Sequence, residues 1–253
     1  MTHGILIDLS GTLHVGDCPL PGAVAAIRRL QRSGVPFRFV TNTSRKTRAM
    51  LHADLVRFGF DVPVGQLFTA PLAVRRYLEE KGLRPHLLVH PDLEAEFDGL
   101  CREEPNAVVI GFARHAFTYG AMNRAFRLLM NGAPLLATGR TRYFEGADGL
   151  ELDTGPFLAA LEYGAQVEAT VLGKPSPEFF FGAVAELGCA PDGAVMVGDD
   201  AVSDVGAAVR AGLRGILVRT GKYRPGDEAK AGIRPEAVAS DVAAALEMIL
   251  KEA

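Results

Sequence analysis

Cysteine is scarce in this sequence, and the three cysteines lie far apart. Cys18, Cys101 and Cys189 are odd in number and form no Cys-x-x-Cys pair. Secreted disulfide scaffolds carry an even and dense set of cysteines, and cysteine-based zinc sites carry closely spaced pairs. We therefore expect free thiols in a protein from a reducing compartment.

The sequence also lacks a long apolar run and a strong charge of one sign. No apolar run approaches the ~18 residues that a membrane-spanning helix needs, and the first residues show no basic segment followed by an apolar one. The formal net charge is -3, and the basic residues are scattered. Surfaces that bind nucleic acids or membranes need clustered basic residues. We expect a cytoplasmic protein that binds neither nucleic acid nor membranes.

The sequence does contain a repeated alternation of short apolar strands and amphipathic helices. With 253 residues, 48% of them hydrophobic, the chain is close to the size at which one core becomes two domains. The alternation predicts an α/β fold with a parallel sheet wound by right-handed crossovers. The predicted helices are Pro21 to Ser33, a segment from Thr43 to Gly59, Pro71 to Lys81, Tyr119 to Met130 and Val242 to Leu250.

A second alternating series interrupts the first. Its predicted strands are Leu87–Val89, Val108–Ile110 and Leu135–Ala137. We therefore expect a Rossmann-like doubly wound core at residues 1–82 and 167–253, with an inserted α/β domain at residues 83–166. The core is expected to resume with a strand at Thr170–Leu172.

A carboxylate stands at the end of the first apolar strand. The run that begins at Gly4 is followed by Asp8-Leu9-Ser10-Gly11-Thr12, so Asp8 comes where a polar turn begins. Open α/β sheets bind ligands outside the carboxyl ends of their strands, and a glycine lets the backbone approach an anion closely. Asp8 is therefore a candidate phosphate acceptor. A strand that simply ends in a polar turn explains this segment equally well.

Three more acids follow an apolar run near the C-terminal end. Asp199 and Asp200 come directly after Gly198, and Asp204 comes five residues after Asp199. Carboxylates gathered from two strand ends would repel one another strongly unless a cation lay between them. A set of oxygen ligands suits Mg²⁺ rather than zinc or copper. Alternatively, Asp200 and Asp204 begin a helix, because acids stabilise the positive end of the helix dipole.

Two further segments carry groups that can hold phosphate. An apolar run ends in Thr41, Asn42 and Thr43, whose hydroxyl and amide groups can hydrogen-bond phosphate oxygens. Lys174 stands in a rigid turn between a glycine and a proline, and its compact charge suits a phosphoryl group. Each segment also has a structural explanation: a turn with a helix cap for the first, and a solvent-exposed lysine for the second.

In their order along the chain, these four segments resemble the four motifs of the haloacid dehalogenase superfamily. The branch that the sequence resembles most has a large C2-type cap domain between the second and third motifs. The resemblance implies a core of the haloacid dehalogenase type, a cap at residues 83–166 and a homodimer formed through the cap. It also implies a phosphatase that acts on a small molecule or phosphoamino acid, with Mg²⁺ as its cofactor.

The resemblance also implies a role for each motif residue. Asp8 would attack phosphorus and form an aspartyl-phosphate, which water would hydrolyse. Mg²⁺ would be held by the carboxylates of Asp8 and Asp199 and by the backbone carbonyl of Ser10. The other residues would orient metal-bound water or clamp the phosphoryl oxygens: Asp200 and Asp204 for the water, and Thr41, Asn42, Thr43 and Lys174 for the oxygens.

Ser10 departs from the common pattern of the superfamily. Most of its phosphatases carry a second aspartate here, which protonates the leaving group, whereas serine at neutral pH exchanges protons poorly. General acid–base catalysis is typically worth ~10² to 10⁴ in rate. We therefore expect substrates whose leaving groups depart without that help, such as phosphohistidine, phospholysine or pyrophosphate. The alternative is a catalytically impaired phosphate-binding or regulatory protein.

Three other polar residues are weaker candidates. His14, four residues after Ser10, is either a substitute acid or a histidine of the loop. Arg142 and Tyr143 form a polar cluster with Arg140. They belong either to a specificity loop that binds substrate or to an exposed hairpin.

Overall fold

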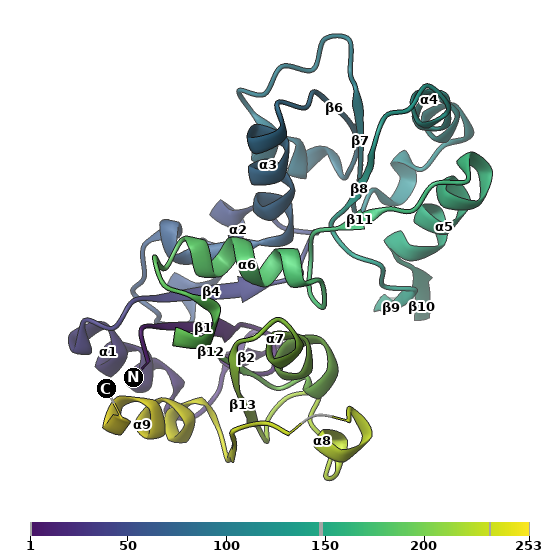
Figure 1. Cartoon of the computed structure of the whole chain (residues 1–253). Helices are drawn as coiled ribbons and strands as arrows, with labels where there is room; N and C mark the ends of the chain where they lie inside the picture. Colours follow the sequence, from purple (N-terminus) through teal and green to yellow (C-terminus); the bar gives the residue numbers. More distant parts are fainter. Residues whose placement is uncertain (1, 147–148, 233, 253) are drawn as a thin grey trace. The chain divides into compact units, whose positions relative to one another are not determined.

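A computed structural model describes residues 2–146, 149–232 and 234–252 of the chain. The chain forms two compact units, each built around a β-sheet (Figure 1). The first unit contains Met1–Thr41, Arg48–Phe68 and Lys174–Ala253, and the second contains Asn42–Thr47 and Thr69–Gly173.

A six-stranded sheet forms the centre of the first unit, in the order β14-β13-β12-β1-β4-β5. β1 pairs with β12 on one side and with β4 on the other, and both pairs are parallel. The chain therefore winds outward from β1 in both directions, which confirms the predicted doubly wound α/β class. The strands are β1 (Gly4–Asp8), β4 (Phe37–Thr41), β5 (Leu67–Thr69), β12 (Ala194–Gly198), β13 (Arg214–Val218) and β14 (Ala237–Ala239).

Helices pack on both faces of this sheet. On one face, α1 contacts α9, and both share a buried apolar cluster with Ile5 and Ile7 of β1. On the other face, α6 contacts β1 and α7, and α6 and α1 lie on opposite sides of the sheet (Figure 1). Outside the six-stranded sheet, the elements of the first unit are β2 (His14–Val15), β3 (Cys18–Pro19), α1 (Ala23–Ser33), α2 (Arg48–Arg57), η1 (Val64–Gln66), α6 (Pro177–Ala185), η4 (Pro191–Gly193), the π-helical η5 (Ala201–Gly206), α7 (Ala207–Arg210), α8 (Asp227–Lys230) and α9 (Val242–Glu252).

A parallel four-stranded sheet, ordered β11-β8-β7-β6, forms the centre of the second unit. Helix α4 presents Ala121, Ala125 and Leu129 at helical spacing to a buried cluster shared with this sheet and with α5. The elements are α3 (Ala70–Lys81), β6 (Pro85–Leu88), η2 (Pro91–Phe97), β7 (Ala107–Ile110), η3 (Arg114–Ala116), α4 (Tyr119–Met130), β8 (Leu135–Ala137), β9 (Tyr143–Gly146), β10 (Gly149–Leu152), α5 (Thr154–Ala165) and β11 (Thr170–Val171).

Helix α3 belongs to the second unit, although the sequence placed it in the core at residues 1–82. The guanidinium of Arg75 on α3 donates hydrogen bonds to the carbonyl oxygens of Glu96, at 2.9 Å, and Asp98, at 2.8 Å. These bonds fasten α3 to η2 and the residue after it. The compact units therefore have different bounds from the expected domains, because this attachment depends on a contact across about twenty residues.

The strand at Thr170–Val171 also lies in the second unit, although the sequence predicted that it resumes the core. Thr170 pairs with Leu136, and Val171 pairs with Ala137, so β11 extends the sheet of the second unit. An apolar pattern predicts that a strand forms but not which strand it pairs with. The short strands β5 and β14 and the helix α5 were not predicted.

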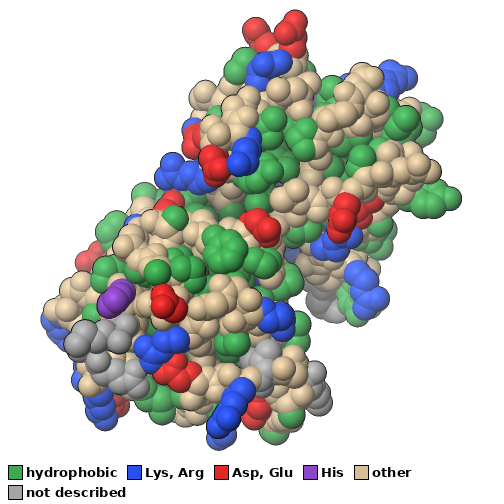
Figure 2. Space-filling view, viewed as in Figure 1, with side chains coloured by type: hydrophobic (Ala, Val, Ile, Leu, Met, Phe, Trp, Pro, Cys, Tyr) green, Lys and Arg blue, Asp and Glu red, His purple; other side chains and the backbone are tan. Residues whose placement is uncertain are grey.

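Charged side chains are interspersed over the face shown in Figure 2, with acidic and basic groups adjacent to one another. The visible surface therefore carries no continuous basic stripe. Among the helices of the described residues, none is long and apolar enough to cross a membrane. The cytoplasmic location and the homodimer stay predictions.

Helix α6 offers a matched test of the core. Phe179 is 0% exposed and its ring lies 5.2 Å from that of Phe68, whereas Phe181 on the same helix is 47% exposed. Replacing a core phenylalanine by alanine costs about 3–5 kcal/mol, and a surface change costs about 0.5 kcal/mol. We expect Phe179→Ala to lower the free energy of unfolding by the larger amount in urea denaturation, and Phe181→Ala by the smaller. Equal losses would contradict the observed packing of α6.

Candidate active site

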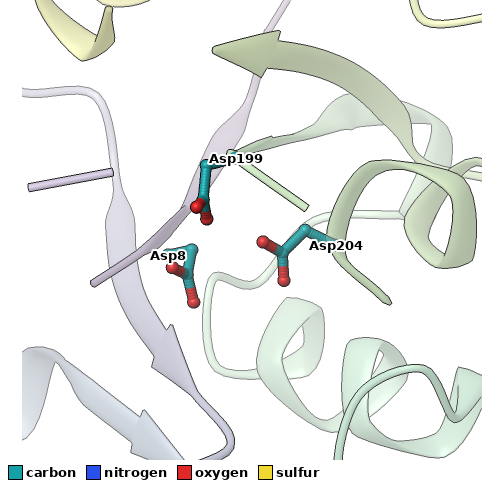
Figure 3. Close-up of side chains that lie close together, drawn as sticks. All are labelled: Asp8, Asp199 and Asp204. Atoms are coloured by element: carbon teal, nitrogen blue, oxygen red, sulfur yellow. The ribbon is translucent and has the colours of Figure 1, made fainter. Parts of the chain in front are cut away.

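Three carboxylates meet at the carboxyl edge of the first sheet. Asp8 ends β1, Asp199 directly follows β12, and Asp204 lies in η5. Because β1 and β12 are paired neighbours, their carboxyl ends lie side by side. Each residue offers an oxygen atom within 4.8 Å of the other two, and Figure 3 shows the three side chains facing one another. The structure thus brings together three of the predicted site residues.

Lys174 lies among these carboxylates. Its Nζ is 2.5 Å from Oδ1 of Asp8 and 2.7 Å from Oδ1 of Asp204, and all three residues are buried. Burial alone would lower the pKa of Lys174, but the two carboxylates outweigh it and raise the pKa. Lys174 is therefore a fixed positive charge, and the predicted alternative of a solvent-exposed lysine is wrong.

Burial shifts the pKa values of the three acids in the opposite direction. It raises the pKa of Asp8 even though Lys174 lies against it, and it raises the pKa of Asp199. It also raises the pKa of Asp204, to about 6. One buried ammonium thus contacts two of three buried carboxylates, and an additional cation would stabilise the charged forms of all three. The oxygen donors fit a hard divalent cation.

Asp199 is enclosed by two glycines in left-handed backbone conformations. The φ angles of Gly11 and Gly221 are 90° and 57°, and a Cβ atom on either would overlap Oδ2 of Asp199. The backbone N–H of Lys222 donates to the same oxygen at 2.7 Å. The Thr220 hydroxyl donates to the Gly11 carbonyl at 2.6 Å and ties the two loops together.

No role was predicted for residues 220–222, which form this support. The available signal was the sequence Thr-Gly-Lys, which begins two residues after the end of the apolar run that becomes β13. Because β13 is parallel to β12, its carboxyl end lies at the same edge of the sheet as Asp199. The order of strands in the sheet was needed to recognise that residues 220–222 lie beside Asp199.

Asp200 hydrogen-bonds the backbone at the start of η5 and is not part of the cluster of Asp8, Asp199 and Asp204. Its Oδ1 accepts hydrogen bonds from the backbone N–H groups of Val202, at 3.0 Å, and Ser203, at 2.9 Å. Burial would raise the pKa of Asp200, but these bonds and the charge of Lys222 outweigh it and lower the pKa. The predicted alternative of a helix-starting acid therefore describes Asp200 well, and its role near a metal stays a prediction.

The first turn of the site holds two hydroxyl groups in different surroundings. Ser10 is exposed and forms an isolated β-bridge with His14. Thr12 is fully buried, and its Oγ1 has no hydrogen-bond partner among the described residues.

The Nδ1 atom of His14 lies 2.8 Å from the Gly16 carbonyl, and the His14 ring packs 5.0 Å from that of Phe58. These contacts agree with a histidine of the loop.

The predicted phosphate-binding residues after β4 divide between the units. Thr41 is buried at the end of β4, and β4 pairs with β1, so Thr41 lies at the same edge as Asp8. Asn42 and Thr43 belong to the second unit. There, a Cβ atom on Gly173 would lie only 3.1 Å from Oδ1 of Asn42. Their contact with phosphate stays a prediction.

Arg142 and Tyr143 lie at the start of the β9–β10 hairpin in the second unit. Tyr143 is 51% exposed, and Cζ of Arg142 lies 5.7 Å from the centroid of its ring. Arg140, by contrast, hydrogen-bonds both carboxylate oxygens of Glu162. The alternative of an exposed hairpin describes this segment, and substrate binding by Arg142 and Tyr143 stays a prediction.

Comparison with known proteins shows the family. The model of the haloacid dehalogenase-like hydrolase family matches residues 5–100, and a second model, described as HAD-hydrolase-like, matches residues 171–245. The chain is 46% identical over 247 residues to "Haloacid dehalogenase-like hydrolase domain-containing protein 2" of Bos taurus, covering 98% of this chain and 95% of that protein. The chain is a haloacid dehalogenase-like hydrolase.

The hydrolase is similar to other proteins over nearly its whole length. It is 44% identical over 257 residues to "Phospholysine phosphohistidine inorganic pyrophosphate phosphatase" of Bos taurus, covering 99% of this chain and 95% of that protein. A solved 4-nitrophenylphosphatase from Thermotoga maritima matches with a TM-score of 0.87, 27% identity and 97% of each chain. These similarities confirm the predicted superfamily and fold class.

The fit between Asp199 and Gly221 can be tested with a matched pair of glycines. Gly221 and Gly226 both have positive φ, but a Cβ atom on Gly226 meets nothing within 4 Å. Backbone strain should lower the free energy of unfolding by about 1–2 kcal/mol in both Gly221→Ala and Gly226→Ala. Overpacking should lower it by about 1–3 kcal/mol more in Gly221→Ala. We expect urea denaturation to show the larger loss for Gly221→Ala. A Cβ atom on Gly221 would also overlap the backbone of Gly11, so equal losses would show that neither Asp199 nor Gly11 packs tightly against Gly221.

Proposed function

We propose that this hydrolase is a Mg²⁺-dependent phosphatase whose nucleophile is Asp8. The proposal depends on one observation: buried Lys174 contacts Asp8 and Asp204 beside Asp199, at the carboxyl edge of a parallel sheet. This arrangement supplies a nucleophile, a positive charge for phosphoryl oxygens and oxygen ligands for a metal. The phosphatase names of the similar proteins support the same reaction class.

The reaction proceeds in two displacement steps. A carboxylate oxygen of Asp8 attacks phosphorus in line, and the bond from phosphorus to the leaving group breaks with its electron pair on the leaving atom. Water then attacks the phosphorus of the aspartyl-phosphate, which releases phosphate and restores Asp8. Lys174 favours the ionised form of Asp8 that the first step requires, because its charge opposes the effect of burial on the pKa.

The metal ligands come from both ends of the chain. Asp8, Asp199 and the backbone carbonyl of Ser10 would hold Mg²⁺, with Asp204 beside them. The bound ion would neutralise charge on the phosphoryl oxygens. Lys174 and the Thr41 hydroxyl would bind those oxygens from the protein side, because both lie at the edge of the sheet where Asp8 ends.

Ser10 suggests the substrate class. No aspartate stands two residues after Asp8 to protonate a leaving group. Substrates with good leaving groups, such as phosphoramidates and pyrophosphate, lose least from this absence. The printed name of the phospholysine, phosphohistidine and pyrophosphate phosphatase supports this substrate class. We therefore propose phosphohistidine, phospholysine or pyrophosphate as substrates.

The metal site can be tested by thermal unfolding with and without Mg²⁺. Asp199 follows β12, and exposed Asp192 lies in η4 before the same strand, so the two Asp→Asn variants form a matched pair. At about 100-fold excess of Mg²⁺ over its Kd, we expect the Tm to rise by about 5–10 °C. The rise should disappear in Asp199→Asn and persist in Asp192→Asn. An unchanged rise in Asp199→Asn would place the metal elsewhere.

The nucleophile and the substrate class can be tested together by phosphate release. The panel contains pyrophosphate, phosphohistidine, phospholysine, 4-nitrophenyl phosphate and an alkyl phosphate, each with Mg²⁺. We expect activity to favour the first three, and Asp8→Asn to lower kcat by at least about 10³-fold because it removes the attacking oxygen. Absence of release across the panel, with phosphate still bound, would favour the phosphate-binding alternative.

Ser10→Asp provides the control for the leaving-group argument. This variant restores an acid two residues after Asp8, so we expect a gain of ~10² or more on the alkyl phosphate. Pyrophosphate should gain much less, because its leaving group needs little protonation. No gain on the alkyl phosphate would refute the explanation based on Ser10 while leaving the role of Asp8 intact.

A further inference from the structure

Arg45 lies in the second unit, three residues after Asn42 on the loop that follows β4. Its Cζ atom lies 3.6 Å from the centroid of the Phe144 ring and 4.7 Å from that of the Phe112 ring. The two rings pack edge to face, with centroids 5.3 Å apart. The aromatic pair, formed by Phe112 after β7 and Phe144 of β9, therefore holds the guanidinium of Arg45.

One carboxylate faces this guanidinium without forming a hydrogen bond to it. Oδ2 of Asp153 lies 3.6 Å from Nη2 of Arg45, beyond hydrogen-bond distance. Oδ1 of Asp153 accepts a hydrogen bond from the backbone N–H of Thr154, at the start of α5. Asp153 is therefore used as a helix cap and only partly balances the charge of Arg45.

The guanidinium keeps donors for a ligand. Arginine has five N–H donors in one plane, and stacking on an aromatic face leaves these in-plane groups available. Within the described ranges no acceptor hydrogen-bonds to Arg45, whose side chain is 41% exposed. Two other arginines of the second unit differ: Arg114 donates a hydrogen bond to Glu151, and Arg140 donates one to Glu162.

We propose that Arg45 binds a second anionic group on the substrate, located on the leaving group. The assignment rests on the proposed phosphatase function and on the prediction that Asn42 and Thr43 of the same loop bind phosphoryl oxygens. Three residues of chain span at most about 10 Å, so one small molecule can reach both Asn42 and Arg45. The substrate class is a phosphorylated compound that carries a carboxylate, as a phosphoamino acid does, or a second phosphate, as pyrophosphate does.

The test compares two ligands that differ in a single carboxylate. Phenyl phosphate and 4-carboxyphenyl phosphate are titrated by calorimetry, with Mg²⁺, into protein carrying Asp8→Asn, so that binding is measured without turnover. We expect the carboxylated ligand to bind more tightly. Adding Arg45→Ala should weaken it roughly 10- to 100-fold, as loss of a hydrogen bond between charged groups does, and leave phenyl phosphate unchanged. Arg45→Lys should restore part of the difference.

Two further variants separate this role from general damage. Arg102 is another arginine of the second unit, and it pairs with Glu94 at 2.8 Å. Arg102→Ala should leave the affinity for both ligands unchanged. Asp153→Asn removes the charge that faces Arg45 and keeps a residue that caps helices well. It should tighten binding of the carboxylated ligand alone.

The outcomes distinguish this proposal from the proposed function. Equal losses for both ligands in Arg45→Ala would show that Arg45 only holds the loop, and no loss for either would show that it binds nothing; both results overturn the proposal. A selective loss supports it even if wild-type protein releases no phosphate, in which case the phosphatase proposal fails alone. A loss for pyrophosphate, measured in the same way, without a loss for the carboxylate would support a second phosphate as the group bound.

Discussion

The burial of three carboxylates close together, two of them against Lys174, is the constraint on which the rest of the site depends. Removing a charged group from water costs several kcal/mol unless a partner of opposite charge is close. Lys174 offsets this cost for Asp8 and Asp204, which it contacts directly. Burial raises the pKa of all three acids, and the neighbouring carboxylates add to this effect. The remaining excess of negative charge fits a divalent cation.

The site also depends on a backbone that approaches its own side chains closely. Gly11 and Gly221 leave room for one carboxylate oxygen of Asp199, and the Lys222 N–H fixes that oxygen. The loop after β13 therefore supports the site without supplying a residue of the acidic cluster. The steric requirement explains why small residues occupy both loops, since any side chain at either glycine would displace the carboxylate.

The chain passes between its two units at positions that matter for the proposed chemistry. Thr41 and Asn42 are consecutive, but the first belongs to one unit and the second to the other. The same is true of Gly173 and Lys174. Phosphate-binding candidates therefore flank both crossings. The loop that begins at Asn42 also carries Arg45, so phosphoryl binding and recognition of the leaving group would share one short segment.

The sequence by itself determined the features that depend on neighbouring residues. Periodicity predicted α4 and the strand that ends in Asp8, because short-range patterns reflect local geometry. The ordered motifs gave Asp199 and Lys174 as candidates, and both lie beside Asp8 in the structure. Tertiary structure alone decided which sheet β11 joins, to which unit α3 belongs, and that Asp200 caps a helix while Asp204 contacts Lys174. Except for the local cap at Asp200, these outcomes depend on contacts between segments far apart in the chain. Their energies come from strand pairing, burial and charge neutralisation, none of which a local pattern contains.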